Sequence, residues 1–282
     1  MNGMSMRRQS LVFVCLLVVF SGGAAAQQTP APYQPQYAQP GKDVIWMPTS
    51  QALVDVMLDL AKVRPTDYVI DLGSGDGRMV ITAAKRGARA MGIEYNPDLV
   101  ELSKVTAEKE GVGGKATFMK ADLFETDFSE ATVITMFLLP QINLKLRPML
   151  LNLKPGTRVV SNSFTMDDWA ADRTVTVSDA CETWCTALLW IVPAKVEGVW
   201  QLATGGMLTI SQQFQMVSGT FGAGSTSTAI TDGKLNGAEI TFTVDGAHYT
   251  GRVSDGVMEG SVTTGAEYRS WKAVKGVATG RD

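Results

Sequence analysis

A predicted strand that runs directly into a glycine-rich turn constrains the fold of this chain more than any other feature. The apolar stretch 68–72 is followed by alternate glycines at positions 73, 75 and 77, and Arg78 then continues a helical pattern. Glycine allows a tight turn and lets the backbone approach a ligand closely. The helix start adds unpaired N–H groups and the positive end of a dipole, so the loop favours an anionic group such as a carboxylate.

Helical and strand patterns alternate from residue 46 to residue 194. Strand patterns cover residues 68–72, 90–95, 116–120, 131–137, 157–164, 174–177 and 186–192. Helical patterns cover residues 50–62, 77–86, 97–111 and 140–153, and we expect Pro148 to break the last of them. Regular alternation with short connections predicts a parallel sheet covered by helices on both faces. The last two strands have no helix between them, so we expect them to be antiparallel neighbours.

Two acidic residues stand where the second and third predicted strands end. Glu94 lies about 20 residues after the glycine loop, where a carboxylate can bind both hydroxyls of a ribose. Asp122 can accept a hydrogen bond from an adenine amino group, with the Leu123 N–H as a donor. The carboxyl ends of parallel strands face one crevice, so these groups predict a nucleoside site there. Arg78 replaces the third glycine of a dinucleotide loop, and no phosphate-binding Lys-Ser/Thr pair follows, which excludes a P-loop.

Residues 195–282 follow a different pattern. They hold 15 of the 28 glycines, and short β-prone runs are separated by Asp232-Gly233, Asn236-Gly237, Asp245-Gly246 and Asp255-Gly256. Such pairs are strong hairpin signals, so we expect an antiparallel all-β module of about six to eight strands. A small barrel and a sandwich both fit this pattern. Four large aromatic residues are expected in the core of the module rather than on a binding platform: Trp200, Tyr249, Tyr268 and Trp271.

The N-terminal residues match a secretory signal. Arg7 and Arg8 precede the apolar run 11–20, and a small-residue stretch then ends at Ala26. Cleavage after Ala26 predicts an exported protein, periplasmic or secreted, and no apolar run, this one included, reaches the roughly 20 residues that span a bilayer. We therefore expect no integral membrane segment in the mature chain. Residues 27–45 are rich in proline and are predicted to form an extended linker.

Composition excludes several kinds of chemistry. The 282 residues are 45% hydrophobic with a formal net charge of −3, which is typical of a globular protein and argues against a nucleic-acid partner. A single histidine, His248, excludes Ser-His-Asp hydrolysis and multi-histidine zinc sites. None of the three cysteines forms a CxxC pair, which excludes zinc ribbons and dithiol redox catalysis. We expect no metal site.

Cys181 and Cys185 are the two cysteines that remain after signal cleavage. On one continuous strand their Cα atoms would lie about 13 Å apart, too far for a disulfide. A bend between them would permit the bond, and the alternative is two inert buried thiols.

The segment Asp71–Gly77 resembles motif I of the class I S-adenosylmethionine-dependent methyltransferases, and Glu94 and Asp122 match the ribose and adenine positions of that family. The resemblance implies an α/β fold, a Rossmann-like seven-stranded methyltransferase sheet, followed here by the small all-β antiparallel C-terminal domain. It also implies S-adenosyl-L-methionine as cofactor. The residues implied to bind it are Asp71, Gly73, Ser74, Gly75, Asp76, Gly77, Glu94, Tyr95, Asp122 and Leu123.

Other motifs resemble a narrower group, the bacterial and mitochondrial-type protein-lysine methyltransferases. They are Trp46–Thr49, Phe137–Pro140, Leu146–Pro148 and Gly156–Ser161. The resemblance implies a protein substrate, which for an exported chain includes membrane or envelope proteins. The Asn/Asp-Pro-Pro-Tyr motif of base methyltransferases is absent after the fourth strand, which argues against a nucleobase acceptor. A non-catalytic exported binding protein and a small-molecule methyltransferase are the alternatives.

Five residues are candidates for handling the methyl acceptor. No histidine lies in this domain to take a proton from a lysine. We expect Thr49 and Asn162 to orient the amine, and the aromatic rings of Phe137, Phe164 and Trp169 to stabilise cationic charge through their faces. The alternative for these aromatic residues is a place in the core.

Overall fold

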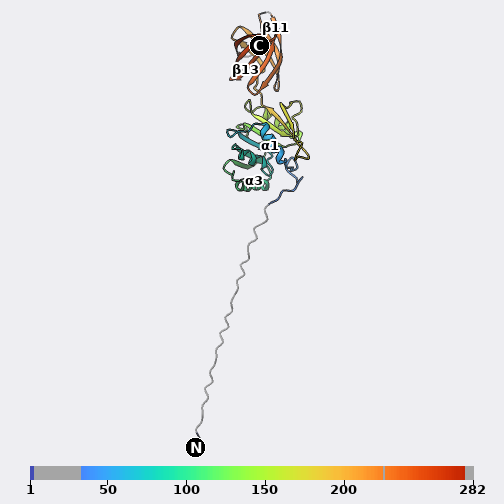
Figure 1. Ribbon diagram of the computed structural model, residues 1–282, viewed down its shortest axis with the longest axis vertical. Helices are drawn as coiled ribbons and strands as arrows, with labels where there is room; N and C mark the ends of the chain where they lie inside the picture. Colours follow the sequence, from blue (N-terminus) through green and yellow to red (C-terminus); the bar gives the residue numbers. More distant parts are fainter. Residues whose placement is uncertain (3–32, 225, 277–282) are drawn as a thin grey trace, which may run out of the picture. The chain divides into compact units, whose positions relative to one another are not determined.

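The computed structural model describes residues 1–2, 33–224 and 226–276. The predicted signal peptide, apart from its first two residues, lies outside the described residues, as does the linker up to Pro32. From Tyr33 onward the chain forms one compact unit. That unit contains a sheet with its helices, followed along the chain by a β-barrel (Figure 1).

A seven-stranded sheet carries the first half of the fold. Its strands are β1 Tyr68–Leu72, β2 Arg89–Glu94, β3 Ala116–Lys120, β4 Val133–Met136, β5 Arg158–Asn162, β6 Arg173–Thr176 and β7 Thr186–Ile191. Their spatial order is β3-β2-β1-β4-β5-β7-β6. The first five strands pair in parallel, and β7 pairs antiparallel with both β5 and β6. The expected fold is confirmed, and the order reverses between β1 and β4, where open sheets form a ligand crevice.

Within the described residues, four helices cover the sheet: α1 Gln51–Leu60, α2 Arg78–Lys85, α3 Pro97–Lys109 and α4 Pro140–Leu150. Two of them have an N-cap side chain: Ser50 Oγ accepts from Leu53 N at the start of α1, and Asn96 Oδ1 accepts from Asp98 N at the start of α3. The expected break of α4 at Pro148 is wrong. Pro148 lies in the last turn, where one backbone donor is lost, and the fully buried Leu150 still packs in the core.

Two hydrophobic clusters occupy the two faces of the sheet. Adjacent residues of β1 divide between them, because Val69 belongs to the cluster with α1, α2 and α3, and Ile70 to the cluster with α4. Burial on both faces accounts for the nearly continuous apolar runs of the central strands. At the amino end of β1, Asp67 forms an ion pair with Arg158 at the start of β5.

The C-terminal module is a closed barrel rather than a sandwich. Its strands are β8 Gly198–Leu202, β9 Gly206–Gln213, β10 Met216–Ala223, β11 Thr226–Asn236, β12 Glu239–Val244, β13 Ala247–Ser254, β14 Val257–Thr264 and β15 Glu267–Lys275. Pairing of β15 with β8 closes the ring. Asp232-Gly233 is not a hairpin turn: it lies within β11 at a shift in register, where a Cβ on Gly233 would meet the Val217 carbonyl oxygen at 2.2 Å.

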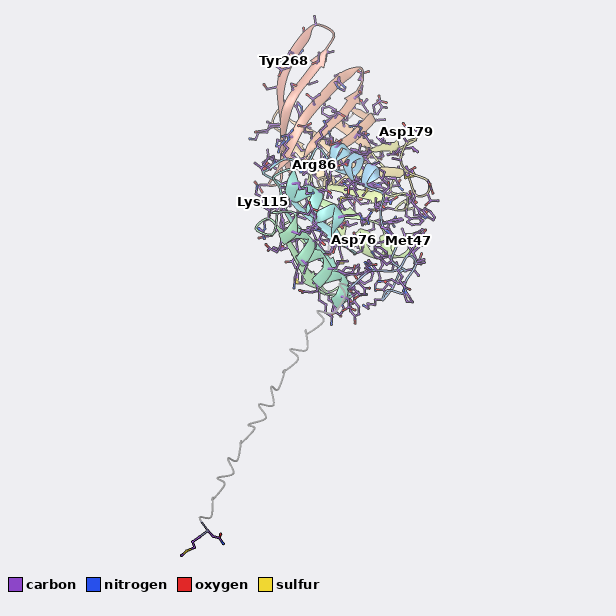
Figure 2. All side chains as sticks on the ribbon, turned by 60° about the horizontal axis from the view of Figure 1, so that its bottom comes forward. Met47, Asp76, Arg86, Lys115, Asp179 and Tyr268 are labelled. Carbon is purple, nitrogen blue, oxygen red and sulfur yellow. A yellow bond between two sulfur atoms is a disulfide. The ribbon has the colours of Figure 1, made fainter. Side chains whose placement is uncertain are left out.

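The barrel core contains three of the four expected aromatic residues. Trp200 and Trp271 are buried, and Tyr249 packs against Trp271 with ring centroids 5.6 Å apart. Tyr268 is 72% exposed and lies on the outside of the barrel, so its expected burial is wrong (Figure 2). It stands three residues before Trp271 on β15, and an odd spacing along a strand places two side chains on opposite faces.

A disulfide joins Cys181 and Cys185 in the loop between β6 and β7. Their Cα atoms lie 5.7 Å apart, so the chain bends between them. Ala180 and Trp184 have φ angles of +56° and +58°, which place the bend in left-handed backbone. Among the described residues, no helix is long and apolar enough to cross a membrane, and no cluster of three or more His, Cys, Asp or Glu side chains is arranged to hold a metal ion.

Candidate active site

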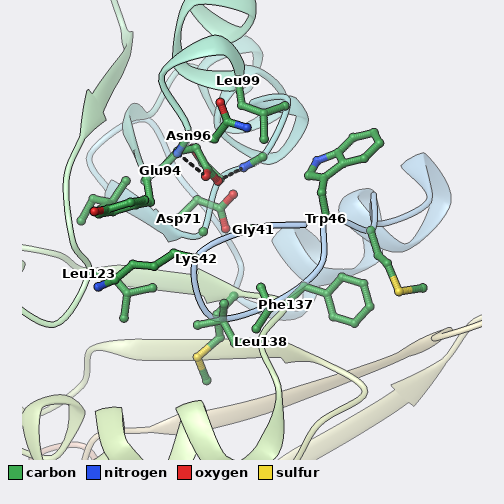
Figure 3. Close-up of a pocket in the computed structure, with 18 of the residues that line it drawn as sticks. Gly41, Lys42, Trp46, Asp71, Glu94, Asn96, Leu99, Leu123, Phe137 and Leu138 are labelled. Atoms are coloured by element: carbon green, nitrogen blue, oxygen red, sulfur yellow. Dashed lines mark hydrogen bonds between the residues drawn. The ribbon is translucent and has the colours of Figure 1, made fainter. Parts of the chain in front are cut away.

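A pocket opens at the carboxyl ends of β1, β2 and β4, beside the point where the strand order reverses. The glycine loop after β1 and the residues that follow β2, β3 and β4 line it. The segment 39–49, which precedes α1, forms a further wall of the pocket, and Figure 3 shows its Gly41, Lys42 and Trp46. The second half of the expected linker is therefore part of the pocket.

The glycine loop needs residues without a side chain at three positions. Gly73, Gly75 and Gly77 have φ angles of +77°, +54° and +79°. A Cβ on Gly75 would lie 2.7 Å from the indole nitrogen of Trp46, and a Cβ on Gly77 would meet side-chain atoms of Ser103 and Phe118 at the same distance. The backbone of the loop therefore packs directly against neighbouring side chains, with no space for a Cβ at Gly75 or Gly77.

Glu94 is fixed by two backbone amides. Its Oε2 accepts from Gly75 N and its Oε1 accepts from Asn96 N, both at 2.9 Å, as the dashed lines of Figure 3 show. A carboxylate oxygen has two acceptor positions, so each retains one for a hydroxyl group. Tyr95, the next residue, is half exposed and also lines the pocket.

Asp71 is a buried carboxyl group at the end of β1. Its Oδ1 accepts from Thr135 Oγ1 at 2.6 Å. The pKa of Asp71 is raised from its ordinary value of 3.8 to about 7, chiefly by burial and also by the nearby charges of Glu94 and Asp76, against the opposing effect of the Thr135 hydrogen bond. A cation placed against such a carboxyl group lowers its pKa, because the cation stabilises the ionised form.

Asp122 lines the pocket together with Leu123, but its carboxylate is already engaged. Oδ1 accepts from Phe124 N at 2.9 Å, and Oδ2 forms an ion pair with Lys42 Nζ. The hydrogen bond from Lys42 holds the pKa of Asp122 below its usual range. Lys42 also lies 4.9 Å from the ring centroid of Tyr95. Each Asp122 oxygen has one partner, as in Glu94, so an adenine amino group would share this carboxylate with Lys42.

Neutral and aromatic groups form the other end of the site. Asn162 Nδ2, at the end of β5, donates to Thr49 Oγ1 at 3.2 Å. The rings of Phe137 and Phe164 stack with centroids 5.9 Å apart, and Trp184 lies 4.9 Å from Phe164. Thr49 and Phe137 also line the pocket, so the structure brings four of the five predicted acceptor residues together.

Comparison with known proteins decides the family. Residues 71–173 match the model of the ANTKMT methyltransferase domain. A protein-lysine N-methyltransferase of Saccharolobus islandicus (strain REY15A) is 46% identical over 139 residues, which make up 48% of this chain and 86% of that protein. The chain belongs to the class I S-adenosylmethionine-dependent methyltransferases.

Two further relatives agree on the methyltransferase family and differ in their acceptors. The adenine nucleotide translocase lysine N-methyltransferase of Mus musculus is 35% identical over 128 residues, 45% of this chain and 56% of that protein. The methyltransferase therefore spans only about half the length of this relative. A solved RNA methyltransferase from Salinibacter ruber in complex with S-adenosyl-L-homocysteine is 49% identical, with a TM-score of 0.50, over 53% of this chain and 96% of that one.

The pocket of the methyltransferase fits S-adenosylmethionine. Asp71 offers a buried carboxyl group for the amino group of the methionine part. In the glycine loop the N–H groups of residues 73, 74, 75 and 77 already donate within the protein, which leaves the N–H of Asp76 for the cofactor carboxylate. Glu94 retains acceptor positions that a ribose could use, and Asp122 and Leu123, which the sequence assigned to the adenine, line the same pocket. When bound, the cofactor supplies an electrophilic methyl group on a sulfonium; the protein supplies binding and alignment.

Trp169 lies outside the site, so its assignment as an acceptor residue is wrong. It is 0% exposed, its ring lies 6.1 Å from that of Trp190, and its carbonyl oxygen accepts from Trp190 Nε1 at 2.7 Å. Phe214 also stacks on it, with ring centroids 5.9 Å apart. These contacts bury the ring in the core cluster around α4, away from the pocket lining.

Three residues of the site were missed by sequence reasoning: Lys42, Trp46 and Trp184. Trp46 belongs to one of the family-like motifs but received no role. Lys42 stands in the proline-rich segment, and its contact with Asp122 spans 80 positions of sequence. For Trp184, the available signal was an aromatic residue between two cysteines that a bend in the chain could join.

Proposed function

We propose that this methyltransferase transfers methyl groups to lysine side chains of proteins. The observation that carries the proposal is the acceptor end of the site, where Phe137, Phe164 and Trp184 gather beside the Thr49–Asn162 pair. Aromatic faces attract alkylammonium groups. The names of the Saccharolobus and mouse relatives support the same acceptor class.

The acceptor residues would hold the amine in line with the methyl group. Asn162 Oδ1 accepts from Ser163 Oγ at 2.9 Å, which fixes the amide so that Nδ2 points at Thr49. Thr49 Oγ1 thereby uses one of its two acceptor positions and retains the other for an N–H of the amine. Alignment of this kind contributes much of the rate of group-transfer enzymes.

We further propose that the protein is exported and acts on membrane or envelope proteins. The basic and apolar pattern of residues 7–26 supports export. The disulfide between Cys181 and Cys185 also supports it, because disulfides persist in oxidising compartments and are rare in the cytosol. Fractionation of cells with N-terminal sequencing tests this location, and an intact Met1 in the cytosol would contradict it.

A transfer assay tests the acceptor. The chain from Gln27 onward is incubated with isotope-labelled donor and, separately, with envelope proteins, total RNA and small-molecule extract. We expect label on lysine residues by peptide mass spectrometry, and a strong reduction with Glu94→Ala. Label confined to RNA would favour the activity named for the Salinibacter relative. Donor binding without transfer to any acceptor would favour a non-catalytic binding protein, and label confined to small molecules would favour the remaining alternative.

A further inference from the structure

The loop between β6 and β7 brings Trp184 to the acceptor end of the pocket. Its ring centroid lies 4.9 Å from that of Phe164 and 6.3 Å from that of Phe137, with tilted planes. Phe137 follows β4, Phe164 follows β5, and Trp184 precedes β7. Three separate segments therefore contribute to one aromatic cluster, and Phe137 joins that cluster to the pocket.

Trp184 is held in a conformation that costs free energy. Its φ of +58° lies in the left-handed region, which is rare and unfavourable for a bulky side chain. Cys185, the adjacent residue, is bonded to Cys181, and its carbonyl oxygen accepts from Val177 N at 2.8 Å. The loop is thus closed by a covalent bond and a backbone hydrogen bond directly beside the strained residue. Residues held this way concentrate at functional sites.

Burial does not account for this arrangement. Trp184 is 43% exposed, so a large part of its ring faces solvent rather than the core. None of the Lys or Arg side chains in the described part of the chain lies over Trp184, Phe137 or Phe164, although five such pairs occur elsewhere. The loop also carries two exposed acidic residues, Asp179 and Glu182, which favour an approaching cation.

We propose that the exposed face of Trp184, with Phe137 and Phe164, is a binding subsite for the alkylammonium group of the acceptor, and that the Cys181–Cys185 disulfide positions Trp184 for it. This rests on the proposed lysine acceptor. The rings already contact one another, so the cation lies on their outer faces rather than between them. Lysine that has received one or two methyl groups is still cationic and less strongly hydrated, so the subsite retains it for the next transfer.

A binding experiment tests the subsite without any transfer step. The ¹⁵N-labelled chain from Gln27 onward, saturated with S-adenosylhomocysteine, is titrated with Nα-acetyl-trimethyl-lysine amide and followed by the indole N–H signals. A neutral analogue with a tert-butyl group in place of trimethylammonium is titrated in parallel. Trp184→Phe assigns the Trp184 signal. We expect that signal to shift and the charged probe to bind about 2- to 30-fold more tightly than the neutral one. Equal affinities, or shifts confined to other tryptophans, would overturn the proposal.

Variants separate the roles of the ring and the disulfide. Trp184→Ala and the double change Cys181→Ser with Cys185→Ser should weaken the charged probe to a similar degree. Both should keep the S-adenosylhomocysteine dissociation constant within about twofold, since neither residue lines the cofactor end. Tyr268→Ala, which removes an exposed aromatic ring of the barrel, should change neither value. Undiminished probe affinity in the double serine variant would contradict the positioning role of the disulfide.

Turnover distinguishes this inference from the proposed function. With a protein acceptor, Trp184→Ala should raise KM more than it lowers kcat and should shift the product toward monomethyl-lysine. If the wild-type protein methylates lysine and Trp184→Ala leaves KM and product states unchanged, the subsite is refuted and the function stands. If no lysine is methylated but the charged probe still binds at Trp184, the function fails and the subsite stands.

Discussion

Asp71 should make cofactor binding depend on pH near neutrality. The carboxyl group is buried, which raises its pKa to about 7, and it should hold the cofactor's ammonium only when ionised. For a pKa near 7, the ionised fraction rises from about one tenth at about pH 6 to about nine tenths at about pH 8. The dissociation constant of S-adenosylhomocysteine should therefore fall about tenfold across this interval.

The same group should affect stability in the opposite direction. Its folded-state pKa lies above the ordinary value of 3.8, so its contribution to stability is present below about pH 3.8 and is lost as pH rises through about 7. A shift of about three units sets an upper bound of about 4 kcal/mol at alkaline pH. Asp71→Asn keeps the shape and an acceptor for the Thr135 hydroxyl, so the ligand-free variant should melt above the wild-type protein at pH 8, with a smaller difference at pH 5.

Titration calorimetry of both proteins at three pH values across this interval provides the measurement. The wild-type protein should show the tenfold trend, and Asp71→Asn should bind weakly with little dependence on pH. A flat wild-type profile would refute the reasoning. A variant that kept the wild-type slope would show that Asp71 is not the titrating group, and it would refute the reasoning as well.

Three further changes test the architecture of the fold and the pocket. Gly77→Ala should lower the free energy of unfolding by about 2 kcal/mol more than Gly111→Ala, because both residues have positive φ but only Gly77 would place its Cβ against other side chains; urea unfolding measures the difference. Arg158→Met should destabilise the protein by about 3 kcal/mol at neutral pH, since it leaves the Asp67 carboxylate, 8% exposed, without its cation. Arg158 helps to hold the pKa of Asp67 below its usual range, so the stability that this pair gives the wild-type protein is lost as pH falls through that lowered pKa. The urea midpoints of the wild-type protein and Arg158→Met should therefore converge in acid. Lys42→Ala should tighten S-adenosylhomocysteine by at most about fivefold, because it frees the Asp122 carboxylate from an exposed ion pair; weaker binding in calorimetry would instead indicate that Lys42 contacts the cofactor.

Local signals in the sequence were sufficient for most of the sheet. β1 and β3 begin and end where the apolar runs do, and Asn96 followed by proline marks the start of α3 through a side-chain cap and a fixed φ. The glycine loop was recognisable because its conformation excludes other residues at Gly75 and Gly77. Each of these features is encoded by a few consecutive residues.

Contacts between distant segments could not be predicted in this way. Lys42 reaches Asp122 only because the segment 39–49 folds back over the pocket, and nothing near Lys42 in the sequence specifies that path. Trp169 was placed at the site because it follows a strand end, but a position in sequence does not determine the direction of a side chain. The ring instead packs in the core against Trp190 of β7 and Phe214 of the barrel.

The two ends of the pocket differ in charge, and the difference suits N-methylation. Asp71, Glu94 and Asp122 lie toward the cofactor end, whereas the side chains of Phe137, Thr49 and Asn162 at the acceptor end are neutral. The charges beside Thr49 are paired with each other, because Arg78 donates to the Thr49 carbonyl oxygen and forms an ion pair with Asp76. A carboxylate in contact with an amine would stabilise its protonated form, which has no lone pair to attack a methyl group. Ring faces attract the cation more weakly and do not accept its proton, so the amine can be held near the site and still become reactive. Replacing the neutral pair with a carboxylate, as in Asn162→Asp, would therefore be expected to shift the pH dependence of turnover upward.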